Sequence, residues 1–176
     1  MAPQKKVDTN VMVVEGWIGD YALEESLLKF RGQNYHHMFV TGGPLNYGYY
    51  LTNYKSTADA ATATLLLLGA SPDSTTSVSR KLVWRDRTYQ SAVALKEYLK
   101  KNYPEIKSFN LVSQGAHAAR SWLLFKMAMP EYKIGVISID DKLFDQEKWW
   151  RTSKGFRTIV FESLGYIYVR FFFTPY

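Results

Sequence analysis

Short apolar runs alternate with longer segments of helical period along most of this chain, and the alternation leaves few folds open to it. The apolar runs have strand length and occupy residues 11–14, 38–41, 77–84, 109–112 and 134–139. A segment of helical period follows each run, at residues 21–31, 57–68, 87–101, 116–129 and 152–171. Repeats of strand and helix are typical of parallel sheets, because a parallel neighbour is reached only through a crossover connection. The sequence therefore predicts an α/β fold.

The predicted topology follows from the handedness of these crossovers. Each of the four connections between strands holds one helix, and such connections are right-handed. We expect a three-layer, Rossmann-like arrangement whose open, purely parallel sheet has five strands in the order 3-2-1-4-5, with helices on both faces. A length of 176 residues with 47% apolar content suits one domain spanning residues 1–176. Polar residues dominate positions 1–6, before the first run, and we expect them to be disordered.

Functional residues are expected at one edge of this sheet. Parallel strands joined by crossovers all end at the same edge, and open α/β sheets bind their ligands there. The loops at this edge comprise residues 15–20, 42–54, 85–88, 113–117 and 140–151. The candidate residues come from these loops and from the helix starts that follow them.

Composition restricts the chemistry and the partners. The chain has no cysteine, which excludes disulfides, thiolate nucleophiles and cysteine-based zinc sites. Its net charge of +6 favours an anionic partner, and we expect a phosphate-containing small molecule and no nucleic acid, although the charge could serve solubility alone. We expect no metal and a monomeric protein, and the sequence leaves the cofactor open.

Familiar catalytic motifs are missing. No G-x-G-x-x-G follows the first strand and no G-x-x-x-x-G-K-[ST] occurs, which disfavours dinucleotide and P-loop nucleotide binding. The nucleophile elbow of α/β-hydrolases needs glycine two residues before its serine, but Leu111 stands there before Ser113. We therefore do not expect a Ser-His-Asp hydrolase.

The second strand runs directly into Gly42 and Gly43. Two glycines permit positive φ, so their N–H groups could form a concave nest for an anion. A Gly-Gly pair before Pro44 is also typical of an ordinary tight turn. Both interpretations stay open.

His117 and Arg120 open the helix after the fourth strand and share one side of it, because they are three residues apart. A helix N-terminus favours negative charge, so these side chains, with Ser113 just before them, can hold a phosphate or carboxylate. The alternative is a surface histidine beside an arginine that pairs with a loop carboxylate.

Arg87 and Thr88 open the third helix and could close around the same anion. The alternative there is plain capping of the helix by Asp86. Glu15, directly after the first strand, is the best-placed general base, and we expect it to act with His117 as the catalytic pair if the protein is an enzyme.

Three motifs in this order carry a resemblance: T-G-G after the second strand, R-T-Y-Q-S-A at the third helix and S-Q-G-A-H-A-A-R after the fourth strand. The chain resembles the YdcF/SanA/ElyC family, also called domain of unknown function 218, from about residue 11 to the last helix. The matching positions are Gly42 and Gly43 in the S-G-G turn, Thr88 and Ala92 in N-T-x-x-N-A, and His117 and Arg120 in H-x-x-R.

The chain also departs from that family pattern. Glu15 and Trp17 stand where glycines are usual, and Thr57 replaces an acidic residue that reappears two positions later as Asp59. Arg87 replaces the first asparagine of N-T-x-x-N-A. A catalytic acid, if there is one, is therefore Glu15 or Asp59.

The resemblance implies an association with the bacterial envelope, often through an N-terminal membrane anchor. One interpretation is an envelope-related hydrolase or transferase that binds a phosphorylated or nucleotide-like small molecule at the sheet edge. The other is a non-catalytic envelope factor that binds a lipid carrier or a protein partner through its pocket or aromatic last helix. Residues 1–10 lack a signal-peptide core, so we expect the chain as written to be cytoplasmic, or envelope-associated if an N-terminal anchor was removed. The apolar stretch 164–173 contains Arg170 and is too short to span a membrane.

Overall fold

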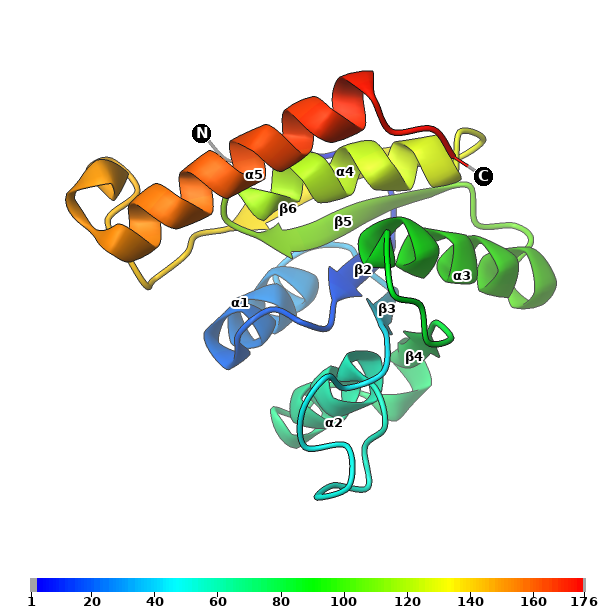
Figure 1. The fold of residues 1–176 in the computed structure, drawn as a ribbon. Helices are drawn as coiled ribbons and strands as arrows, with labels where there is room; N and C mark the ends of the chain where they lie inside the picture. The colour runs from blue at the N-terminus through cyan, green and yellow to red at the C-terminus, as the bar shows by residue number, and fades with distance from the viewer. Residues whose placement is uncertain (1–2, 176) are drawn as a thin grey trace.

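The structure is a computed structural model that describes residues 3–175. Its strands form one sheet in the order β1-β6-β5-β2-β3-β4. The strands are β1 (Gln4–Lys5), β2 (Val11–Glu15), β3 (His37–Gly42), β4 (Thr75–Ser79), β5 (Ser108–Gln114) and β6 (Lys133–Ile139). Neighbours from β4 across to β6 are parallel, whereas β1 runs antiparallel to β6. The α/β prediction is confirmed, and helices lie on both faces of the sheet (Figure 1).

The prediction of five strands in a purely parallel sheet is wrong in strand count, and the full order differs, because β1 adds an antiparallel edge strand beyond β6. The five predicted strands keep their predicted relative order, β4-β3-β2-β5-β6. Gln4 pairs with Ile137 and Lys5 with Val136. Both β1 residues are exposed, so an edge strand of this kind carries no apolar pattern that a sequence could reveal. The predicted disorder of residues 1–6 is therefore wrong at Gln4–Lys5, while residues 1–2 lie outside the described part.

A buried asparagine in β5 fixes the segment after β1. The backbone N–H of Val7 donates to Asn110 Oδ1 (2.9 Å), and Asn110 Nδ2 donates to the carbonyl of Val7 (3.0 Å). Asn110 Nδ2 also donates to the hydroxyl of Tyr35 (2.8 Å). These bonds satisfy a polar side chain that is buried in the sheet, as buried amides require.

Within residues 3–175, five helices and two short 3₁₀ turns connect or follow the strands. They are α1 (Asp20–Arg31), α2 (Thr57–Leu67), η1 (Pro72–Ser74), α3 (Arg87–Asn102), α4 (His117–Ala128), η2 (Trp149–Arg151) and α5 (Ser153–Phe171). Helices α1 and α2 pack on one face of the sheet, and α3 and α4 pack on the other. Helix α5 lies against α4 on the side away from the sheet (Figure 1). No helix among residues 3–175 has both the length and the apolarity to cross a membrane.

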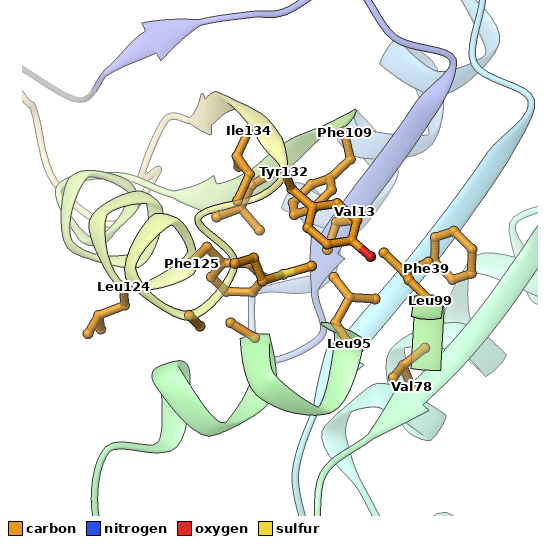
Figure 2. Close-up of a cluster of buried hydrophobic side chains, with 14 of the residues drawn as sticks. Val13, Phe39, Val78, Leu95, Leu99, Phe109, Leu124, Phe125, Tyr132 and Ile134 are labelled. Carbon is orange, nitrogen blue, oxygen red and sulfur yellow. The ribbon is translucent and has the colours of Figure 1, made fainter. Parts of the chain in front are cut away.

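Successive side chains of β2 point to opposite faces of the sheet and pack into two different cores. Val11 and Val13 belong to the core beneath α3 and α4, and Met12 and Val14 belong to the core beneath α1 and α2. The first core contains an edge-to-face pair, Phe109 and Phe125, with ring centroids 6.3 Å apart (Figure 2). Burying each such side chain contributes roughly 1.5–3 kcal/mol. These two cores hold the carboxyl edge of the sheet in place.

The third predicted strand, at residues 77–84, differs from the observed β4. The strand begins at Thr75 and ends at Ser79, and the chain then leaves the sheet as a loop over residues 80–86. Leu82 and Trp84, which extended the apolar pattern, are exposed in this loop. The shift matters for the site, because it moves Arg80 from a strand to the carboxyl edge.

Candidate functional site

A cavity of about 670 Å³ lies at the carboxyl ends of β2 and β3, between the 80–88 segment and helices α4 and α5. Seven of the eight predicted site residues line it: Glu15, Gly42, Gly43, Arg87, Thr88, His117 and Arg120. The structure therefore brings together residues that lie up to 105 positions apart in the sequence. Among residues 3–175, no group of three or more His, Asp or Glu side chains is arranged to hold a metal ion.

Ser113 is the predicted site residue that does not line the cavity. Strand β5 continues to Gln114, two residues beyond its predicted end, so Ser113 is a strand residue rather than a loop residue. It is 0% exposed, and its Oγ has no hydrogen-bond partner within the described part of the chain.

Gly42 and Gly43 do not form the predicted anion nest. Neither has a positive φ, and the N–H of Gly43 already donates to Thr57 Oγ1 (3.3 Å). Their lack of a side chain serves close packing instead: a Cβ on Gly42 would overlap Thr57 Oγ1, and a Cβ on Gly43 would overlap the guanidinium of Arg80. Because Gly42 has no side chain, α2 can begin directly over the end of β3. Because Gly43 has none, the guanidinium of Arg80 can lie there as well.

Arg80 is a cavity residue that the sequence analysis missed, because it was assigned to the interior of a longer strand. Its Nη1 donates to the carbonyl of Lys81 (3.0 Å), but its Nε is buried and has no partner among residues 3–175. Burial, and after it the nearby charge of Arg87, lowers the pKa of Arg80. An arginine stays protonated even so. The cavity therefore contains a partly buried cation whose hydrogen bonds are incomplete.

The start of α3 adds to the positive potential on the same side of the cavity. Arg87 is the first residue of the helix, and Thr88 follows it in the cavity wall. Asp86 occupies the expected N-cap position with a left-handed backbone (φ 54°), but its side chain makes no capping hydrogen bond to the helix. Backbone N–H groups at a helix start favour a negative charge, and an anion in the cavity could supply it.

His117 and Arg120 meet a carboxylate, which comes from α5 rather than from a loop. Arg120 donates to Glu162 through Nε (2.8 Å to Oε2) and Nη2 (3.1 Å to Oε1), and His117 Nδ1 lies 3.1 Å from Glu162 Oε1. Burial raises the pKa of Glu162, but hydrogen bonds from His117 and Arg120 outweigh it and hold the pKa at about 2. The pair predicted to hold an external anion thus already holds an internal one.

The imidazole of His117 has a second possible partner at the same nitrogen. Arg120 Nη2 lies 2.9 Å from His117 Nδ1 and donates to it only when that nitrogen carries no proton, whereas Glu162 accepts from it only when it does. His117 Nε2 is buried without a partner in the described structure, and the ring contacts Trp17 edge-on with centroids 4.7 Å apart. Whether Nδ1 carries a proton therefore decides whether it donates to Glu162 or accepts from Arg120.

Glu15 places a buried carboxylate in the cavity wall, with 2% of the residue exposed. Both of its oxygens accept from the hydroxyl of Ser121 on α4 (3.1 and 2.9 Å). No cation among residues 3–175 lies within ion-pair distance of it. Such a carboxylate can accept a proton from a bound hydroxyl or water.

Asp59, the other carboxylate considered for this role, does not line the cavity. Ser56 and Ser77 each donate to it at 2.6 Å, and its own N–H donates back to Ser56 Oγ (3.0 Å). The side chain of Asp59 therefore ties the start of α2 to β4.

Glu162 and Gly165 on α5 were also missed by the sequence analysis. Glu162 is the one carboxylate of α5 and lies seven residues from each of the two buried positions of that helix, Gly155 and Val169. That spacing places it on the packed side, which is a signal the sequence does contain. A Cβ on Gly165 would lie 3.0 Å from Arg120 Cδ, so the glycine gives the arginine room beneath the helix.

Fold and site together define an α/β protein with an arginine-rich cavity at the carboxyl edge of its sheet. Comparisons of the chain with protein-family models, with curated proteins and with solved structures find no match. The resemblance to the YdcF/SanA/ElyC family therefore stays a prediction from the motifs.

Proposed function

We propose that the cavity binds a phosphorylated or nucleotide-like small molecule, with its phosphate at Arg80 and Arg87. The observation that carries the proposal is Arg80, a partly buried guanidinium in the cavity wall whose Nε lacks a partner among the described residues. Buried polar groups are normally hydrogen-bonded, and a guanidinium matches the oxygens of a phosphate. Arg87 and the start of α3 add positive potential on the same side.

The size and the remaining walls of the cavity support a small ligand. Its volume falls within the usual range of small-molecule sites, which is roughly 300–1,000 Å³. Trp17 and Trp84 also line it, and an indole ring can stack on a nucleobase or a sugar. Arg120 contributes little to phosphate affinity in this proposal, because Glu162 neutralises it.

The same cavity could support hydrolysis or transfer of a phosphate-containing group. Glu15 would take a proton from the attacking water or hydroxyl, and His117 would give one to the leaving oxygen from Nε2. The arginines would stabilise negative charge that develops on the phosphate oxygens. The motif resemblance to an envelope-associated family is the reason to look for such a substrate in the bacterial envelope.

The alternative is a non-catalytic envelope factor that binds a lipid carrier or a protein partner. The exposed aromatic residues of α5 favour it. Ligand binding without turnover, unaffected by replacing Glu15 with Gln, would distinguish this alternative from an enzyme.

Thermal unfolding with a ligand panel tests the proposal: inorganic phosphate, a sugar phosphate, a nucleoside diphosphate and an isoprenoid phosphate. A ligand at about 100 times its Kd should stabilise the protein by about 2.7 kcal/mol. Arg80→Gln should weaken binding by about 10- to 150-fold, the equivalent of a charged hydrogen bond worth about 1.5–3 kcal/mol. Lys101→Gln is the matched control, because it removes one exposed cation near the far end of α3. Equal affinities in the two variants, or no stabilising ligand, would contradict the proposal.

A further inference from the structure

Helix α5 is apolar on the side that faces solvent. Its buried residues are Gly155 and Val169, and Glu162 between them reaches Arg120 on α4. The opposite side exposes large apolar side chains, including Phe161 (66%), Leu164 (57%) and Phe171 (72%). A surface helix normally shows the reverse arrangement, with its polar side toward water.

The outer side of α5 comprises Phe156, Phe161, Leu164, Ile167 and Phe171, all of them exposed. At 100° per residue, these positions fall within one continuous sector of the helix, away from the line through Gly155, Glu162 and Val169. Helix α5 packs mainly on α4 and η2 and is the outermost element on its side of the molecule (Figure 1). A contiguous apolar side of this kind marks an interaction surface.

Positive charges predominate on residues 148–175, although the exposed Asp145 and Glu147 precede them in the chain. Five exposed cations occupy η2, the residue before it and α5: Lys148, Arg151, Lys154, Arg157 and Arg170. None of them forms an ion pair with another residue of the described range 3–175. Glu162 is the sole carboxylate among residues 148–175, and it points inward to Arg120 and His117.

We propose that the outer side of α5 binds the surface of an anionic lipid bilayer. Apolar side chains flanked by Lys and Arg match the acyl region and the charged headgroups of such a surface at the same time. A second copy of this chain fits less well. A two-fold dimer through this side would bring the cations of residues 148–175 in both copies close together, and that range has no exposed carboxylate to pair with them.

Co-sedimentation of the full chain with vesicles tests this surface, using phosphatidylcholine alone or mixed with phosphatidylglycerol. We expect binding to the mixed vesicles, weakened by salt, and much weaker binding to phosphatidylcholine alone. Lys154→Gln with Arg157→Gln should reduce binding to mixed vesicles by about 25-fold, since each cation near an anionic surface contributes roughly fivefold. Phe161→Gln with Phe171→Gln should reduce binding to both kinds of vesicle by at least about tenfold.

The matched controls are Leu67→Gln and Lys101→Gln, which remove an exposed apolar side chain and an exposed cation elsewhere, on α2 and α3. They should bind mixed vesicles as the unaltered protein does. None of the four substituted α5 positions lines the cavity. Stabilisation by a phosphate ligand should therefore be unchanged in the α5 variants. A failure of the lipid-surface proposal is thus distinguishable from a failure of the proposed cavity function. Equal binding to both kinds of vesicle would overturn the proposal. So would a protein that does not bind vesicles but forms dimers, if the two phenylalanine substitutions dissociate those dimers.

Discussion

Replacing Glu162 with Gln should destabilise the protein at neutral pH and remove a specific part of its pH dependence. The variant keeps the shape of the side chain but removes the charge that Arg120 and His117 hold. The pKa of Glu162 falls from an ordinary 4.5 to about 2, which corresponds to about 3 kcal/mol of stability. With 19% of the side chain exposed, solvent screens this pair only in part. We expect a loss of about 2–3 kcal/mol, or about 5–10 °C in Tm for a chain of this length.

The sign of the pH dependence follows from the direction of the shift. A carboxyl whose pKa is lower in the folded state contributes stability that is fully present above its unfolded pKa and is lost as the pH falls through its folded pKa. The difference in free energy of unfolding between the unaltered protein and Glu162→Gln should therefore be constant above about pH 5. It should shrink between 4.5 and about 2 as the carboxyl becomes protonated.

Urea denaturation followed by circular dichroism, at several pH values from neutral to about pH 3, measures this difference. Glu105→Gln is the control, because it removes an exposed carboxylate that makes no ion pair with another described residue. Added phosphate should stabilise Glu162→Gln more than the unaltered protein, since the variant leaves Arg120 and His117 without their carboxylate. A difference of the same size at pH 3 and pH 7, or no loss of stability at all, would refute the reasoning.

Two further substitutions test other parts of the structure. Gly43→Ala should push the Arg80 guanidinium away from the end of β3, which weakens phosphate binding but changes the free energy of unfolding by no more than about 1 kcal/mol. Titration calorimetry measures the affinity and urea unfolding measures the stability. An unchanged phosphate affinity would count against the site. Asn110→Ala should cost about 1–3 kcal/mol and speed amide hydrogen exchange at Val7, because Val7 loses both its bonds to the side chain; unchanged exchange there would show that β1 holds without Asn110.

The strands whose bounds the sequence predicted most closely, β2, β3, β5 and β6, are those with side chains buried on both faces, whereas the displaced strand β4 is only partly buried. Residues 11–14 form a continuous apolar run and residues 134–139 are largely apolar, because α1 and α2 on one side and α3 and α4 on the other cover them. Strand β1 has no such cover, since Gln4 and Lys5 are exposed, and its pairing with β6 depends on contacts more than 130 residues away in sequence. Local patterning carries no information about such an edge strand.

The sequence predicted which residues lie at the candidate site better than it predicted which charged side chains pair with one another there. The rule that ligands bind at the carboxyl edge of a parallel sheet leads to Glu15, Arg87 and His117, because each follows a strand or opens a helix there. The partner of Arg120 was not predictable from the edge loops, since Glu162 lies 42 residues away, on a helix that packs behind α4. The role of Gly43 stayed open in the sequence, because a sequence shows that a glycine is present but not whether positive φ or close packing requires it.

Strand β1 also determines how much of the edge of β6 stays open to another chain. Strand β6 contains Ile134, Val136, Ile137 and Ile139, and an uncovered strand of this composition would be a template for pairing with another chain. Gln4 and Lys5 occupy part of that edge and present a short strand with a charged side chain. Short charged edge strands discourage the addition of further strands. Gln4 and Lys5 thus cover part of the edge of β6, and loss of the anchor at Asn110 would expose that edge to solvent.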